Sequence, residues 1–231
     1  MKRLSPQLVI FDVDGVLVDV RGSFHRSILD TVHFFTGRRV MYGEISAWKN
    51  RGGYNDDWRL STDWIASLGG KASYATVKRQ FMKFYWGEGR SPGNVQREKW
   101  LVSRGRLARW SRRAPLALFT GRTRTELDYT LDRMKMRQYF TKIVTMDDVA
   151  RLKPDPEGLL QLLGSLDARN AVYLGDNVDD AISSQRAGVP FLGVLPGGGT
   201  PQSRRTRSGL LRKFGALRIL DKAIELEKYW Q

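Results

Sequence analysis

Short apolar segments that alternate with amphipathic segments indicate an α/β fold. Helical spacing of leucines separates the later apolar segments, for example in residues 127–134 and 159–166. Such alternation predicts a parallel sheet with right-handed crossovers, whose strands are buried on both faces. The predicted strands are Leu8–Phe11, Leu116–Phe119, Ile143–Thr145, Ala171–Leu174 and Phe191–Leu195.

The residues between the first two predicted strands have a different pattern. Residues 21–100 contain helical spacing, as in Ile28, Val32 and Phe35, together with paired glycines, and no parallel strand is evident in them. A segment of this length is too long for a simple crossover. We therefore predict a discontinuous α/β core domain, residues 1–20 and 101–231, with an inserted helical domain at 21–100.

Composition narrows the class of protein. The 39 basic and 24 acidic residues give a formal net charge of +15, which favours anionic partners without identifying them. The absence of cysteine excludes a disulfide framework, a cysteine-ligated zinc and a thiol nucleophile. No apolar run approaches the roughly 20 residues that span a bilayer, and Asp12 interrupts the first run before it could form a signal peptide. We expect a cytoplasmic protein without a membrane partner.

Two acids follow directly after the first predicted strand, in the stretch LVIFDVDGVLVDV. Asp12 and Asp14 are at i and i+2, so both can face one point at the carboxyl end of the strand. In an open parallel sheet this edge binds ligands. Two adjacent carboxylates repel each other, so the structure must supply a cation or keep one acid protonated. Taken alone, the DVDG string favours a polar turn, in which Asp-Gly ends the strand.

The other strand ends carry complementary groups. Thr120 and the Gly121 amide follow the second strand and are suited to bind phosphate oxygens. Lys153 lies in a proline-flanked turn after the third strand, and Asp176 and Asp180 follow the fourth. Carboxylates, a hydroxyl and an ammonium at one edge predict a divalent cation site beside a phosphate site.

Four segments resemble, in order, the motifs of the haloacid dehalogenase-like (HAD) hydrolase superfamily. They are FDVDGVLVD, LALFTGR, RLKPDP and YLGDNVDDAISSQRAG. The inserted helical domain resembles the C1 cap of subfamily I, and the KPDP turn is similar to that of the phosphoglycolate-phosphatase-like branch. The resemblance covers nearly the whole chain. It implies a Rossmann-like three-layer sandwich with a parallel sheet and an inserted α-helical cap, and a phosphatase that acts through an aspartyl-phosphate.

The resemblance also implies a role for each matching residue. Asp12 would attack phosphorus, and Asp14 would protonate the leaving alkoxide and then activate the hydrolytic water. Thr120 and Gly121 would bind phosphoryl oxygens, which Asp14 and Lys153 would also contact, and Lys153 would offset the negative charge.

The implied cofactor is Mg²⁺. Asp12, the backbone carbonyl of Asp14, and Asp176 would be its ligands. Asp180 completes the predicted metal set, acting through water or by orienting Lys153.

Other activities of the superfamily stay open. A phosphomutase keeps both acids of DVDG, whereas a dehalogenase lacks the second acid because a halide leaving group needs no proton. A phosphonatase needs a cap lysine, for which Lys49 in AWKNRGGYNDDW is the candidate, although the pattern favours a solvated lysine beside Trp48. The same stretch provides the predicted substrate-selecting residues, which are Lys49, Arg51, Gly52, Gly53 and Asn55.

We expect the substrate to be a small phosphorylated metabolite. Arginine-rich clusters at 97–113 and 204–213 leave nucleic acid as an alternative partner, or these clusters form a solvated basic face. The glycine-rich segment 196–209 is expected to be a loop. The sequence does not predict the oligomeric state.

Overall fold

The computed structural model describes residues 4–195, 197–198 and 200–230. The chain divides into two compact units. One consists of Met1–Val18 with Trp100–Gln231, and the other of Asp19–Lys99. These boundaries differ by one or two residues from the predicted boundaries of the core domain and the inserted domain.

A six-stranded sheet forms the centre of the first unit, in the order β10-β9-β8-β1-β6-β7, and every pair of neighbours is parallel. The strands are β1 (Leu8–Phe11), β6 (Leu116–Phe119), β7 (Lys142–Val144), β8 (Ala171–Gly175), β9 (Phe191–Val194) and β10 (Ala216–Leu220). The predicted fold class is confirmed, and none of the five predicted strands differs by more than one residue at either end. The edge strand β10 was not predicted.

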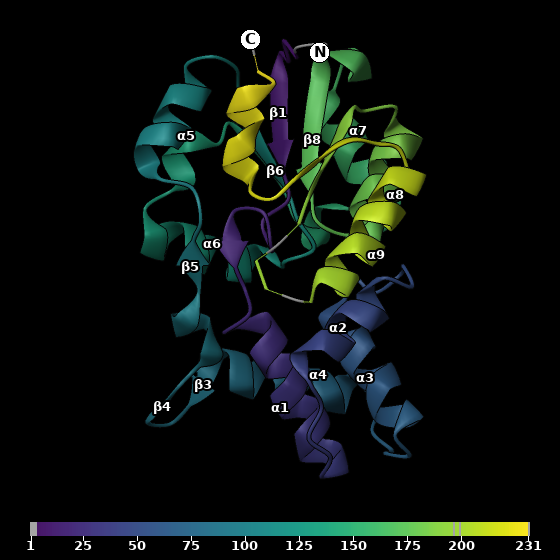
Figure 1. Cartoon of the computed structure of the whole chain (residues 1–231). Coiled ribbons are helices and arrows are strands. Elements are labelled where there is room, and N and C mark those ends of the chain that lie inside the picture. The colour runs from purple at the N-terminus through teal and green to yellow at the C-terminus, as the bar shows by residue number, and fades with distance from the viewer. Residues whose placement is uncertain (1–3, 196, 199, 231) are drawn as a thin grey trace. The chain divides into compact units, whose positions relative to one another are not determined.

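Helices cover both faces of this sheet, as Figure 1 shows, with α7, α8 and α9 on one side and α5 and α6 on the other. Leu159, Ala181 and Leu211 of the first group pack against inward-facing residues of the sheet. On the opposite face, the Trp110 ring of α5 stacks on Phe11, with ring centroids 5.7 Å apart. The helices are α5 (Arg104–Ser111), α6 (Arg124–Met134), α7 (Glu157–Leu163), α8 (Val178–Ala187) and α9 (Pro201–Lys213). Short 3₁₀ turns are Arg137–Tyr139, Met146–Asp148, Ala168–Asn170 and Ala223–Lys228.

Helix α9 corrects the prediction of a loop at 196–209. The helix begins at Pro201, whose fixed φ suits the first helical position, and the Thr200 hydroxyl caps it by accepting from the Ser203 amide at 3.1 Å. Leu211 is fully buried and anchors the helix on the sheet. One apolar anchor in an arginine-rich segment gives too weak a periodicity to be recognised. Pro196 and Gly199 of the predicted loop lie outside the described residues.

The second unit is mainly helical. Its elements are α1 (Phe24–Thr36), α2 (Tyr42–Lys49), α3 (Asp57–Ser67), α4 (Tyr74–Trp86), the hairpin of β3 (Gly87–Glu88) and β4 (Ser91–Pro92), and a 3₁₀ turn at Asn94–Arg97. Phe24, Phe81 and Tyr85 form an aromatic cluster in its core. Strands β2 (Val18–Asp19) and β5 (Lys99–Trp100) pair where the chain enters and leaves the unit. Among all described residues, no helix combines the length and apolar content needed to cross a membrane.

Candidate active site

The predicted polar residues of the first unit gather at the carboxyl edge of the sheet. Asp12 directly follows β1, Thr120 follows β6 and Asp176 follows β8, so the parallel arrangement brings three strand ends to one edge. Lys153 lies between β7 and α7, and Asp180 lies in the first turn of α8. The sheet therefore assembles the predicted set from positions up to 168 residues apart in the sequence (180 − 12).

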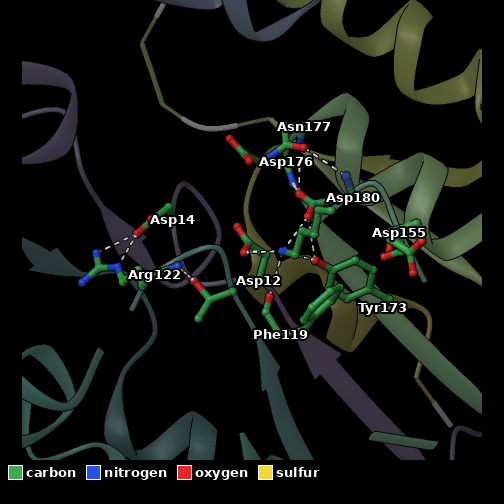
Figure 2. A network of polar contacts seen from close by, with 12 residues as sticks. Asp12, Asp14, Phe119, Arg122, Asp155, Tyr173, Asp176, Asn177 and Asp180 are labelled. Carbon is green, nitrogen blue, oxygen red and sulfur yellow. Dashed lines mark hydrogen bonds and ion pairs between the residues drawn. The ribbon is translucent and has the colours of Figure 1, made fainter. Parts of the chain in front are cut away.

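The Lys153 ammonium is the centre of this arrangement and is almost fully buried. Its Nζ lies 2.9 Å from Asp12 Oδ1 and 2.8 Å from Asp180 Oδ1. It also lies 2.9 Å from the Phe119 carbonyl oxygen and 2.7 Å from the Tyr173 hydroxyl. In Figure 2 the side chains of Asp12, Tyr173 and Asp180 point toward one another around this nitrogen. We call Asp12, Lys153, Tyr173 and Asp180 the lysine cluster.

Asp180 has all of its acceptor positions engaged. Its Oδ1 accepts from Lys153 and, at 2.6 Å, from the Tyr173 hydroxyl. Its Oδ2 accepts from the backbone amides of Asp176 at 3.1 Å and Asn177 at 3.2 Å, at the start of α8. A carboxylate held in this way is better suited to fix Lys153 than to bind a cation directly, in line with the indirect role considered for it.

Burial and charge act in opposite directions on the ionisable groups of the lysine cluster. Burial raises the pKa of Asp12 well above its ordinary value, Lys153 opposes this shift, and the carboxylates of Asp180, Asp14 and Asp176 add to it. Burial lowers the pKa of Lys153, but Asp12 and Asp180 more than offset this effect, and the net pKa is raised. The lysine therefore carries its charge, and the excess of carboxylates over ammonium favours a further cation.

The carboxylates at this edge fit a hard divalent cation. One oxygen each of Asp12, Asp176 and Asp180 lies within 4.8 Å of the others. Because Asp180 is already saturated by hydrogen bonds, Asp12 and Asp176 are the residues whose oxygens could hold a cation, and such oxygens are the ligands that Mg²⁺ prefers. The absence of a side chain at Gly15 leaves room for the Asp176 carboxylate. A Cβ at Gly15 would lie 2.5 Å from Asp176 Oδ2, and its φ of +76° is unfavourable for other residues.

Asp14 does not join the lysine cluster. Figure 2 shows its side chain turned toward Arg122. Asp14 Oδ1 accepts from Arg122 Nε at 2.9 Å and from Nη2 at 2.7 Å, while Nη1 donates to Thr130 at 2.7 Å. The Arg122 side chain is 1% exposed and that of Asp14 is 30% exposed. Asp14 thus lies at the outer side of the edge, where its carboxylate is accessible.

The predicted phosphate-binding residues Thr120 and Gly121 follow β6 on the same edge. The Thr120 hydroxyl is buried and accepts from the Arg122 amide at 3.2 Å, which fixes the turn.

Three residues at this edge were missed in the sequence analysis. Tyr173 was assigned only to an apolar strand, Arg122 appeared only as the last residue of the LALFTGR motif, and Arg207 was included in a basic cluster. Arg207 of α9 extends to Asp176, with Nη1 3.3 Å from Oδ2, and its side chain is only 12% exposed. A polar atom within an otherwise apolar strand would have been the available signal for Tyr173.

Glu126 is a buried acid beside the site. It is the third residue of α6 and forms a reciprocal capping box with Thr123, whose amide donates to Oε2 at 2.8 Å. Within the described part of the chain its Oε1 is buried without a hydrogen-bond partner. Burial raises the pKa of Glu126 to about 7, although the Thr123 hydrogen bonds and Arg122 lower it.

This pKa predicts a pH-dependent stability. The pKa of the Glu126 carboxyl group is 4.5 in the unfolded state and about 7 in the folded state, so the folded state binds the proton more tightly. The stability linked to this proton is complete below pH 4.5 and is lost as the pH rises through about 7. As the pH rises from 4.5 to 8, we expect the free energy of unfolding of Glu126→Gln to increase by roughly 2–3 kcal/mol relative to that of wild type. Urea unfolding at each pH measures this difference.

Glu44→Gln provides the matched control, because Glu44 is the exposed third residue of α2 and makes the same capping-box contact with the backbone of Met41. The contrast between the two variants isolates the effect of burial. A stability difference between Glu126→Gln and wild type that stays constant over this pH range would contradict the prediction.

The five predicted substrate-selecting residues belong to the second unit. Lys49 ends α2 and forms an ion pair with Asp57 at 2.8 Å, and the Arg51 guanidinium lies 4.2 Å from the centroid of Trp48. Gly52 and Gly53 follow with φ values of +76° and +77°, and Asn55 precedes α3. Their contact with a substrate stays a prediction.

Comparison with known proteins agrees with the fold and the motifs. Residues 110–194 match the family model for haloacid dehalogenase-like hydrolase. Imidazoleglycerol-phosphate dehydratase of Phytophthora nicotianae is 34% identical over 205 residues, which is 85% of this chain and 44% of that protein. Phosphoglycolate phosphatase 1 of Pseudomonas aeruginosa is 27% identical over 191 residues, which is 80% of this chain and 67% of that protein. The chain thus spans less than half of the first relative and about two thirds of the second.

A solved structure gives a match over almost the entire chain. The crystal structure of a predicted phosphoglycolate phosphatase from Haemophilus somnus superimposes with a TM-score of 0.77, covers 97% of both chains and is 19% identical. At this identity the match concerns the fold. The family model matched by residues 110–194 agrees with the resemblance of the four motifs at the strand ends to those of the haloacid dehalogenase-like hydrolases.

Proposed function

We propose that this protein is a Mg²⁺-dependent phosphatase that hydrolyses a small phosphate monoester through an aspartyl-phosphate. The observation that carries the proposal is the lysine cluster, in which a buried ammonium bonds the Asp12 carboxylate beside a further acid, Asp176. A carboxylate nucleophile next to an anionic phosphate needs such a charge balance.

The proposed chemical steps are those that the resemblance to the family implies for these side chains. An Asp12 oxygen attacks phosphorus, so a new P–O bond to the carboxylate forms as the ester P–O bond breaks. Asp14, at the accessible outer side of the edge, gives its proton to the leaving alkoxide. It then takes a proton from water, whose oxygen attacks phosphorus and releases inorganic phosphate, and Asp12 is regenerated.

The other groups of the edge stabilise charge. Lys153 offsets the charge on Asp12 and the phosphoryl group, and Thr120 and the Gly121 amide bind phosphoryl oxygens. Mg²⁺, held by Asp12, Asp176 and the backbone carbonyl of Asp14, would neutralise phosphate charge and favour attack by an anionic nucleophile.

We assign substrate selection to the helical unit, which would act as a cap domain. Its loop between α2 and α3 carries Lys49, Arg51, Gly52, Gly53 and Asn55, and thus combines cationic and amide side chains with two flexible positions. Phosphoglycolate is the first candidate because a relative is named for its hydrolysis. The dehydratase activity in the name of the other relative is not transferred, because the chain spans only 44% of that protein.

The phosphonatase alternative requires a neutral lysine amine that forms a Schiff base. Lys49 is engaged in an ion pair with Asp57, which stabilises its protonated form and counts against this role. Borohydride trapping of a lysine adduct would restore the phosphonatase alternative.

The decisive experiment is release of inorganic phosphate from a panel of phosphate esters in Mg²⁺. The panel contains 2-phosphoglycolate, imidazoleglycerol phosphate, sugar phosphates and a 3′-phosphorylated oligonucleotide. We expect turnover of at least one small ester, its loss in EDTA and its recovery when Mg²⁺ is added.

Each alternative predicts a different result of the panel. Conversion of a sugar phosphate to an isomer without release of phosphate would indicate a phosphomutase. Exclusive turnover of the oligonucleotide would replace the metabolite by nucleic acid. No turnover of any ester, with Mg²⁺ binding demonstrated by calorimetry, would refute the proposed function.

A further inference from the structure

Tyr173 is a buried polar residue of β8, one of the two central strands of the six-stranded sheet. Its side chain extends from β8 under the carboxyl edge and is fully buried. The ring packs between Phe119 and Phe191, with ring centroids at 6.0 Å and 5.8 Å. An apolar side chain would fill this space without the need to satisfy a hydroxyl group. The hydroxyl therefore requires an explanation beyond packing.

The hydrogen bonds define the direction of this hydroxyl. Its single proton goes to Asp180 Oδ1 at 2.6 Å, since a carboxylate can only accept. The oxygen lone pair then faces Lys153 Nζ, which donates at 2.7 Å. Tyr173, Lys153 and Asp180 thus form a closed triangle of hydrogen bonds. The third of these bonds, between Lys153 Nζ and Asp180 Oδ1, is 2.8 Å long.

The four oxygens around Lys153 differ in how firmly they are held. The Phe119 carbonyl belongs to β6, Tyr173 is fixed by packing in β8, and Asp180 is fixed by the amides at the start of α8. Asp12 differs, because in the proposed reaction it gains and loses a phosphoryl group in every turnover. An ammonium has three protons for these four oxygens, so three firmly held acceptors are sufficient to keep it in place.

We propose that Tyr173 is a positioning residue that holds the Lys153 ammonium in place while the bond between Lys153 and Asp12 changes during the reaction. The three fixed acceptors form a support for the ammonium, so that its charge stays at the point where the phosphoryl group is transferred. Without the hydroxyl, Asp180 loses a donor and attracts the ammonium more strongly, away from Asp12. This inference rests on the proposed function.

Tyr173→Phe tests the proposal, because it removes only the hydroxyl and retains the packed ring. We expect kcat to fall about 10-fold to 100-fold, the scale of one hydrogen bond to a charged group, while KM changes less than about threefold. The small change in KM follows because the hydroxyl lies in the core beneath the lysine and does not contact the substrate. A residue with a purely structural role would change the unfolding midpoint and leave the kcat of the folded enzyme unchanged.

Tyr85→Phe is the matched control. Tyr85 is also fully buried and donates to a carboxylate, Glu98, at 3.2 Å, but it lies in the core of the helical unit. We expect this variant to lose stability to a similar extent and to retain kcat within about twofold. Values of kcat and KM for Tyr173→Phe within twofold of wild type would overturn the inference, as would an equal loss of kcat in Tyr85→Phe.

The inference and the proposed function fail in distinguishable ways. If wild-type enzyme releases no phosphate from any ester, the proposed function fails and the inference fails with it. If wild-type enzyme is active and Tyr173→Phe is equally active, only the inference fails.

Discussion

Replacement of Asp12 by asparagine is expected to reduce the release of inorganic phosphate by about 10⁴-fold or more, the scale seen when a covalent nucleophile is removed. The amide has almost the same shape as the carboxylate. Its oxygen can still accept a hydrogen bond from Lys153, whose Nζ lies 2.9 Å from Asp12 Oδ1 in the wild-type protein. It lacks the negative charge needed to attack phosphorus. Phosphate release from the best ester of the panel measures the effect, at substrate concentrations below and above KM.

The fold of Asp12→Asn is expected to persist. Lys153 keeps Asp180 as a charged partner, and the burial of Asp12, which raises its pKa, makes the loss of this one charge tolerable. Asp132→Asn serves as a control, since Asp132 is exposed, pairs with Arg137 at 3.1 Å and is expected to be replaceable without loss of turnover. Turnover of Asp12→Asn within tenfold of wild type would rule out Asp12 as the nucleophile.

Replacement of Lys153 by methionine is expected to affect both stability and turnover. The methionine side chain fills a similar volume but leaves two buried carboxylates, Asp12 and Asp180, facing each other without the ammonium. Loss of one partner from a buried ion pair costs about 3–5 kcal/mol. We expect a decrease of this size in the free energy of unfolding, measured in urea with EDTA, and a fall in kcat of at least about 10²-fold.

Lys83→Met is the control for Lys153→Met, because Lys83 forms an exposed ion pair with Glu88. Such pairs contribute at most about 1 kcal/mol. If Lys153→Met were as stable as wild type, the buried carboxylates would have to be satisfied in another way, and the charge balance assigned to the lysine cluster would be wrong.

The backbone of the site could be predicted from the sequence because strand and turn signals are local. The apolar run Leu8–Phe11 and the acids after it define the end of β1 without knowledge of any other segment. The parallel topology then brings Asp12, Lys153 and Asp176 to one edge.

The partners of the side chains depend on packing between distant segments, and this is why they could not be predicted. Tyr173 lies in a short, entirely buried strand among apolar neighbours, so its hydroxyl is recognisable as a partner of Lys153 only in the folded protein. Arg122 and Asp14 are 108 residues apart in the sequence and pair only through the adjacency of β1 and β6. The edge strand β10, which is half-buried, has no continuous apolar run.

The order in which the ribosome produces the chain gives the lysine cluster a further consequence. Asp12 emerges early, but its ammonium partner comes 141 residues later, and Asp180 follows 27 residues after Lys153. A nascent chain that ends before residue 180 therefore contains Asp12 without the complete set of groups that surround its carboxylate in the folded protein. Closure of so long a loop is entropically costly and depends on the pairing of β1 with β6 and β8. The complete lysine cluster therefore cannot form until residue 180 has been synthesised.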